Sequence, residues 1–168
     1  VQTMINKCSY RGPDNKKVWS DNTFSLGHNL LQITGEFVTE STQPWKTPHG
    51  NILIYNGEIF NYADLIKKYT DFIPKTTCDT ELLAWGLDNV GLDFIGEIDS
   101  MHAFAYYKPG SGSIYLSRDH VGIKPLYYIF SKDTFYFASE IKALLPHCKN
   151  ALHFDEDYMD RMAFSCWA

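Results

Sequence analysis

The sequence predicts an α+β fold built on antiparallel strands. Six short runs are rich in aromatic and β-branched residues and are bounded by Gly, Pro, Asp or Lys, a pattern typical of strands. Four other segments carry helical patterns and fall mostly between or after those strands. The last four strand-like runs follow one another too closely for crossover helices. They are therefore expected to form one antiparallel meander, with helices segregated from it.

The strand-like runs are, in chain order, residues 23–33, 51–57, 101–107, 113–119, 125–130 and 134–139. The predicted helices are residues 62–69, 79–91, 139–145 and 155–167. In the second helix an apolar stripe is formed by Leu82, Leu83, Trp85 and Leu87. Asp79 or Thr80 suits its N-cap position.

Composition favours one folded domain, which we expect to span residues 1–168. Hydrophobic residues make up 45% and charged residues 21% of the chain, and no segment has a disordered composition. The formal net charge of -5, without a basic cluster, argues against nucleic-acid binding. Apolar runs are too short to cross a membrane, and the first residues lack the pattern of a signal peptide. A cytoplasmic location is expected.

The four cysteines give no sign of a metal site or a disulfide scaffold. Cys8, Cys78, Cys148 and Cys166 are scattered, with no C-x-x-C pair and no histidine at metal-ligand spacing. Buried or inert thiols in a reducing compartment are the simplest interpretation of these four residues.

Polar motifs follow several predicted strands, and each has an ordinary interpretation when taken alone. They are RGPDN (residues 11–15), YNGEIFNY (55–62), CDTE (78–81) and SRDHVGIKPLYY (117–128). Asn56-Gly57 is typical of a tight turn, and Asp79 of a helix cap. Residues 122–125 suit a hairpin connection.

The order of these motifs along the chain carries more information than any one of them. RGPD, GHxxLxI, QP, NGEIxNY, xDTE, RDxxGIKPLYY and ASEIKALL occur in that sequence. In this the chain resembles the N-terminal glutaminase domain of asparagine synthetases, a class II glutamine amidotransferase of the N-terminal-nucleophile hydrolase type. The resemblance covers nearly the whole chain. It implies a four-layer αββα sandwich, in which two antiparallel sheets pack face to face with helices outside.

The resemblance also implies roles in catalysis. Release of ammonia from glutamine requires a nucleophile, a base and donors for the developing oxyanion. In the family an N-terminal Cys attacks, and its own α-amine is the base. The Asn56 side-chain amide and the Gly57 N–H would form the oxyanion hole. Gly57 is expected to lack a side chain so that the backbone can approach the substrate closely.

Four further residues match the family's glutamine-binding residues. Glu58 and Asp79 match acids that hold the α-ammonium group, a contact that selects an amino acid over a plain amide. Leu31 and Ile33 match a strand that lines the glutamine pocket. Glutamine is therefore the expected ligand.

Two departures from the family pattern bear on activity. The sequence starts with Val1 and not Cys, so we expect a domain that is incomplete at its N-terminus and inactive as given. Leu30 stands where the family has an Arg that pairs with the glutamine α-carboxylate. Lys16 or Lys17 could supply the missing cation. His102 is expected to be a packed strand residue and not a catalyst.

No Ser-Gly-Gly-x-Asp-Ser loop, the family's ATP-binding element, occurs in the sequence. ATP and Mg are therefore implied only for a synthetase domain or subunit outside these residues, and no cofactor or metal is expected in this domain. Homo-oligomerisation stays open. The alternative function is a catalytically dead relative that keeps the scaffold to bind a partner or a small molecule.

Overall fold

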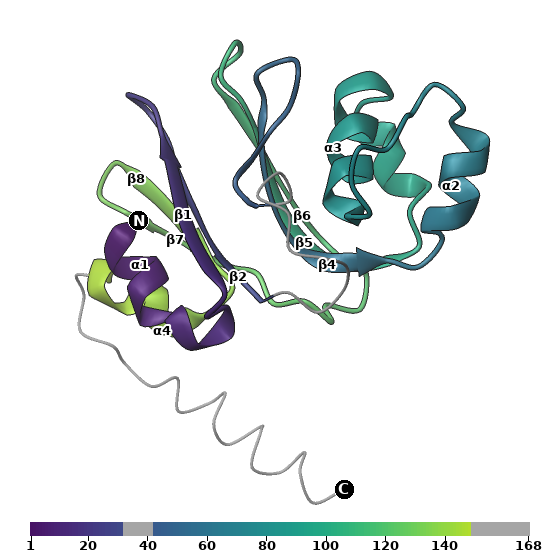
Figure 1. Ribbon diagram of the computed structural model, residues 1–168. Helices are drawn as coiled ribbons and strands as arrows, with labels where there is room; N and C mark the ends of the chain where they lie inside the picture. Colours follow the sequence, from purple (N-terminus) through teal and green to yellow (C-terminus); the bar gives the residue numbers. More distant parts are fainter. Residues whose placement is uncertain (32–41, 149–168) are drawn as a thin grey trace, which may run out of the picture.

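The computed structural model describes residues 1–31 and 42–148, and it confirms an α+β fold with antiparallel sheets (Figure 1). The strands are β1 (Asn15–Ser20), β2 (Ser25–Leu30), β3 (Trp45–Lys46), β4 (Ile52–Ile59), β5 (Ser100–Lys108), β6 (Ser113–Arg118), β7 (Tyr127–Ser131) and β8 (Thr134–Ala138). The α-helices are α1 (Gln2–Lys7), α2 (Tyr62–Lys68), α3 (Asp79–Asn89) and α4 (Ile141–Leu144). Short 3₁₀ turns occupy Ser9–Arg11, Leu92–Gly96 and Leu145–His147.

The strands form one larger sheet and two hairpins. The larger sheet has the order β3-β4-β5-β6, and the hairpins are β1-β2 and β7-β8. Helices α1 and α4 lie outside the hairpins, whereas α2 and α3 lie outside the larger sheet (Figure 1). This arrangement of layers is consistent with a sandwich.

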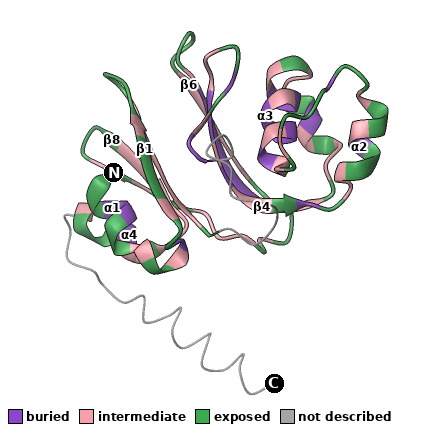
Figure 2. Cartoon of the chain, viewed as in Figure 1, coloured by how far each residue is buried: buried purple, intermediate pink, exposed green. Residues whose placement is uncertain are grey.

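The main core lies between the larger sheet and helices α2 and α3, where Figure 2 shows most of the buried chain. Leu82, Leu83 and Leu87 of α3 are fully buried there against Phe104 and Tyr106 of β5. Burying each such side chain contributes roughly 1.5–3 kcal/mol. The apolar stripe predicted for this helix is therefore its packing face. Smaller clusters lie between the sheets, around Leu26, Ile52 and Tyr107, and beneath α1 and α4.

The prediction of a single four-stranded meander is wrong. β5 pairs with β6 in the larger sheet, whereas β7 pairs only with β8. The chain leaves the larger sheet after Arg118 because the next residue, Asp119, folds the connection back on itself. The Asp119 carboxylate accepts hydrogen bonds from the N–H groups of Ile123, Lys124 and His102.

Several elements differ from those expected. α1, β1 and β3 were not predicted, because their sequences are short or too polar to show an apolar period. β4 continues through Asn56-Gly57 to Ile59, so this pair is not a turn. Cys78 and not Asp79 or Thr80 holds the N-cap position of α3. The helix predicted for residues 155–167 lies outside the described residues.

Candidate active site

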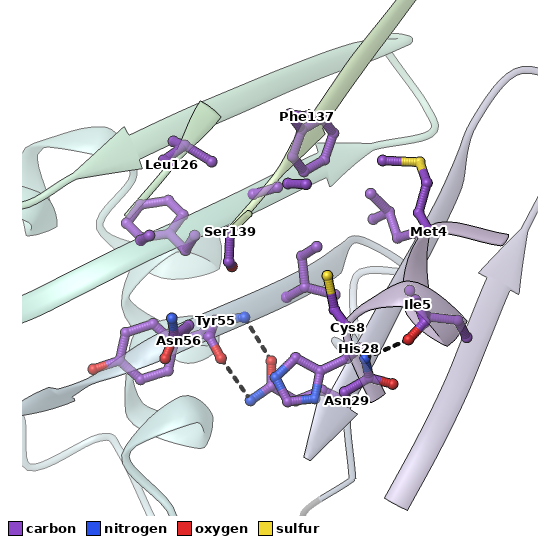
Figure 3. A pocket seen from close by; sticks show the side chains of 18 of the residues that line it. Met4, Ile5, Cys8, His28, Asn29, Tyr55, Asn56, Leu126, Phe137 and Ser139 are labelled. Atoms are coloured by element: carbon purple, nitrogen blue, oxygen red, sulfur yellow. Dashed lines mark hydrogen bonds between the residues drawn. The ribbon is translucent and has the colours of Figure 1, made fainter. Parts of the chain in front are cut away.

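A cavity of about 870 Å³ lies between the larger sheet and the two hairpins. β4 and β5 form one wall, β2 and β8 line the opposite side, and the first residues of the chain contribute Met4 and Ile5. Figure 3 shows Tyr55 and Asn56 on one side of the cavity and Phe137 and Ser139 on the other. The site is thus lined by segments that are far apart in the sequence.

The structure brings five of the six predicted site residues to this cavity. Asn56, Gly57 and Glu58 line it from β4, Asp79 from the first turn of α3, and Leu31 from the residue directly after β2. Ile33 lies outside the described residues.

The edge of β4 that faces away from β5 is the central feature of the site. Phe60 N–H donates to the backbone oxygen of Asp99, the residue before β5. In the antiparallel register, the backbone N–H groups of Glu58 and Asn56 therefore also point toward β5. The alternate residues, Tyr55, Gly57 and Ile59, therefore direct their N–H groups to the other edge. β3 pairs with β4 only at Ile52 and Leu53, and leaves these three N–H groups without a strand partner.

Side chains from elsewhere bind the first and the last of these three groups. Gln43 Oε1 accepts from Tyr55 N at 2.5 Å, and Gln43 Nε2 donates to Tyr55 O at 3.0 Å. Asp79 Oδ2 accepts from Ile59 N at 3.0 Å. Gly57 N–H lies between them, and no hydrogen bond among the described residues occupies it. A backbone donor is therefore available next to the Asn56 side chain.

Asn56 itself is half-buried beside this donor. Its side-chain amide makes no hydrogen bond with the described residues, and it lines the cavity. Two adjacent donors, one from a side chain and one from the backbone, are what an oxyanion hole requires.

Asp79 is a partly buried carboxylate that meets neutral donors and no cation. Its Oδ2 accepts from the Tyr55 hydroxyl at 3.2 Å as well as from Ile59 N. Burial raises the pKa of Asp79, while the hydrogen bonds from Ile59 N and Tyr55 oppose that rise and the nearby Glu58 adds to it. None of the ion pairs found within residues 1–31 and 42–148 includes Asp79. The carboxylate therefore favours a cationic ligand in the cavity.

The structure gives a packing reason for Gly57, separate from the predicted approach of its backbone to the substrate. A Cβ atom at this position would lie 2.3 Å from Met101 O and 2.6 Å from Cε2 of the Tyr55 ring. The missing side chain thus makes room for the neighbouring strand and for Tyr55. Close approach of the backbone to a substrate is not the only demand on this residue.

Leu30 lines the cavity, as expected if it replaces a ligand-binding Arg. Lys16 and Lys17 are not among the described residues that line it, so the structure gives no support for a rescue by either. Lys17 instead donates to Thr42. The Lys and Arg side chains that line the cavity within the described part are Arg11, which pairs with Glu140, and Lys124.

Among the lining residues that were not predicted as site residues, three have properties that bear on the site. Gln43 is 6% exposed and clamps β4 as described above. His28 of β2 is kept neutral, since burial lowers its pKa to about 4. Cys78 precedes Asp79, and burial raises the pKa of its thiol. All three lie within motifs of the sequence, Gln43 in QP, His28 in GHxxLxI and Cys78 in CDTE, but the motifs did not show that these side chains line the site.

His102 lies outside the cavity and behaves as a packed strand residue. Its two ring nitrogens lie 2.8 Å from Ser100 Oγ and 2.9 Å from Ser117 Oγ, and its ring stacks on Phe104. Burial lowers its pKa.

Within the described ranges, no group of three or more His, Cys, Asp or Glu residues is arranged to hold a metal ion. The same residues contain no helix that is long and apolar enough to span a bilayer.

Proteins of similar sequence identify the family to which the chain belongs. The chain is 33% identical over 163 residues to the glutamine-hydrolyzing asparagine synthetase 2 of Bacillus subtilis, covering 95% of this chain and 22% of that protein. It is 32% identical over 148 residues to the glutamine-hydrolyzing asparagine synthetase B of Escherichia coli, covering 86% and 26%. A probable glutamine-hydrolyzing asparagine synthetase of Schizosaccharomyces pombe is 34% identical over 154 residues, covering 86% and 27%.

The chain thus spans about a quarter of the length of these relatives, between 22% and 27%. The family model described as the glutamine amidotransferase domain matches residues 1–167, which includes every described element of the fold. The chain therefore belongs to the glutamine amidotransferase domain family.

Proposed function

We propose that this domain binds L-glutamine in the cavity and releases ammonia from its side-chain amide. The ammonia would serve ATP-dependent amide synthesis by a synthetase unit outside these residues, as the names of the relatives suggest. ATP and Mg would belong to that unit. The observation that carries the proposal is the Gly57 N–H, which bonds to none of the described residues and lies between the bound Tyr55 and Ile59 amides, beside Asn56.

The two ends of a bound glutamine would meet different parts of the cavity. Its α-ammonium group would neutralise Asp79, with Glu58 close by, and its amide oxygen would lie at Asn56 and Gly57. With Leu30 in place of an Arg, the α-carboxylate needs another cation. Lys124 lines the cavity without an ion pair to any described residue, so it is the candidate.

Hydrolysis at this site requires a nucleophile with a base beside it. By the family resemblance this would be an N-terminal Cys, whose own α-amine is the base, and not Cys8 or Cys78, which line the cavity without an α-amine of their own. The thiol of the N-terminal Cys would add to the amide carbon, and its α-amine, with a pKa of about 7.7–8 in a free chain, would take the thiol proton and pass it to the departing ammonia. Water would then cleave the thioester to give glutamate.

Binding is tested on the 168-residue chain itself by calorimetry with L-glutamine. We expect binding, and we expect Lys124→Met to weaken it roughly tenfold or more because a charge-assisted contact is lost. Lys16→Met is the matched control, since Lys16 does not line the cavity. Equal affinities for the two variants would exclude Lys124 as the carboxylate partner.

Hydrolysis is tested on the chain extended to begin with Cys-Gly-Ile. We expect ammonia release from glutamine, and we expect Asn56→Ala to lower the rate roughly 100-fold, the usual cost of losing one oxyanion donor. Asn89→Ala, at the exposed end of α3, is the control. An extended chain that neither binds nor hydrolyses glutamine would refute the proposal.

Leu30 stands where the family has an Arg that binds the glutamine α-carboxylate. This replacement favours a second candidate function, a catalytically dead scaffold that binds a partner or a small molecule. The same extended chain separates the two functions. If it is inactive and Leu30→Arg restores ammonia release, the site has lost its activity through this residue. If it is active with Leu30 in place, the dead scaffold is excluded.

A further inference from the structure

We infer that Tyr55 is a positioning residue for glutamine recognition, and that it holds the Asp79 carboxylate in place for the α-ammonium group. The inference rests on the proposed function, because it assigns the ligand of that same site. Tyr55 would touch Asp79 and not the reacting amide, so it is not a catalytic residue.

The geometry begins with the pleat of β4. Tyr55, Gly57 and Ile59 share one face of this strand, the face toward α3. The Tyr55 ring extends along this face beneath Gly57, where a Cβ atom would meet its Cε2 and Cζ at 2.6 and 2.8 Å. It then reaches Asp79 Oδ2, the same oxygen that Ile59 N–H holds. Because Gly57 has no side chain, the Tyr55 ring can lie against it and place its hydroxyl next to the Asp79 carboxylate.

Tyr55 is itself fixed at three points. Its side chain is 3% exposed within the main core, and its N–H and C=O are both bound by the Gln43 amide. Burial, with Asp79 next, raises the pKa of Tyr55, so the hydroxyl keeps its proton and can donate it to the carboxylate. A rigid donor that cannot ionise is suited to orienting an acid.

The hydrogen bond from Tyr55 stabilises the ionised form of Asp79, which burial destabilises. The hydrogen bonds from Ile59 N–H and from Tyr55 lower its pKa, in opposition to burial. An α-ammonium group is bound strongly only by the ionised carboxylate. Loss of the Tyr55 hydroxyl should thus both loosen the carboxylate and move its protonation to higher pH.

The test is Tyr55→Phe in the 168-residue chain, with L-glutamine affinity measured by calorimetry across pH. We expect the affinity to fall roughly fivefold or more at neutral pH, given the usual strength of a hydrogen bond to a charged group. In the wild-type chain, binding weakens as pH falls through the pKa of Asp79. In the variant this weakening should begin at a higher pH. A purely structural loss would lower affinity by the same factor at every pH.

Other titratable groups face Asp79 and must be accounted for in this profile. They are Tyr55 and Glu58 of β4, Tyr62 of α2 and Cys78 before α3. The pKa of Asp79 is therefore followed directly, from the ¹³C signal of its carboxyl group. An upward shift in Tyr55→Phe supports the inference, and an unchanged titration overturns it. This readout needs no ligand, so it tests the inference even if glutamine does not bind and the proposed function fails.

Tyr106→Phe is the matched control. Tyr106 is also fully buried, and its hydroxyl donates to a carboxylate, Asp88, but it does not line the cavity. We expect this variant to bind glutamine with unchanged affinity. A glutamine analogue without the α-amino group, 4-carbamoylbutanoate, is the second control. Tyr55→Phe should leave its affinity unchanged, and an equal loss for both ligands would count against the inference.

Discussion

At the scale of single residues, Gly57 meets two demands that act on opposite sides of its backbone. Its N–H lies on the free edge of β4, where it is available to a ligand. Its Cα faces Met101 O and the Tyr55 ring, which leave no room for a methyl group. A side chain here would thus disturb the sheet, and through Tyr55 it would also displace Asp79.

Gly57→Ala should therefore destabilise the fold. The new Cβ would lie 2.3 Å from a backbone oxygen that cannot move without shifting β5. We expect a loss of about 2–3 kcal/mol in the free energy of unfolding, measured by urea denaturation, as for overpacked sites. Gly110→Ala is the control, because a Cβ atom there meets nothing within 4 Å. Equal stability of the two variants would show that β4 and β5 adapt easily at this point.

At the scale of secondary-structure elements, β4 is a long strand with an incomplete partner. β3 pairs with only two of its residues. Beyond that point the Gln43 amide takes the place of a strand, since it binds both the N–H and the C=O of Tyr55. It also donates to Thr80 Oγ1 at 3.3 Å, which connects the edge of the sheet to α3. One side chain thus stabilises the two elements that carry the site.

Gln43→Leu keeps the volume of this side chain approximately and removes its polar groups. Tyr55 N–H would then be buried without its partner, at a cost of about 1–3 kcal/mol, while Tyr55 C=O would lose the Gln43 donor and keep its hydrogen bond with His28. We expect a clear fall in the urea midpoint, together with weaker glutamine binding because Tyr55 and Asp79 lose their support. Gln2→Leu is the control, since Gln2 is exposed and its side chain donates to the neighbouring Asn6 side chain on the surface of α1. An unchanged midpoint for Gln43→Leu would show that water replaces the clamp.

The sequence predicts the elements with strong periodicity and misses those that depend on distant contacts. The apolar stripe of α3 and the β-branched and aromatic runs of β4 to β6 are evident locally. The separation of β7-β8 from the larger sheet depends on Asp119 and its backbone partners, which no period in the sequence reveals.

In the candidate site, too, the sequence predicts residues that lie in local motifs and misses contacts between residues that are distant in the chain. The motifs pointed to Asn56, Gly57, Glu58 and Asp79, and these residues do line one cavity. The contact between Tyr55 and Asp79 joins residues 24 positions apart, so sequence spacing could not show it.

At the scale of the whole molecule, the cavity divides the fold into a well-packed part and a less packed part. All of β5 from His102 to Tyr107 is buried between the cavity side and the main core. No residue of β7 or β8 is fully buried. Aromatic side chains of this hairpin, such as Tyr128 and Phe130, are 62% and 75% exposed. Burial of apolar surface, the main source of stability, is therefore distributed unevenly between the two layers.

This difference predicts that local unfolding of the β7-β8 hairpin requires less free energy than unfolding of the larger sheet. Amides with few buried contacts exchange through local opening, whereas those in a packed core exchange only through global unfolding. In hydrogen–deuterium exchange, amides of β5 and β6 that bond to each other should be protected at least about tenfold more than those of β7 and β8. The two pairs form a matched comparison, because both are antiparallel hairpins closed by short turns within one sample. Equal protection of the two hairpins would mean that the layers unfold as one cooperative unit despite the cavity between them.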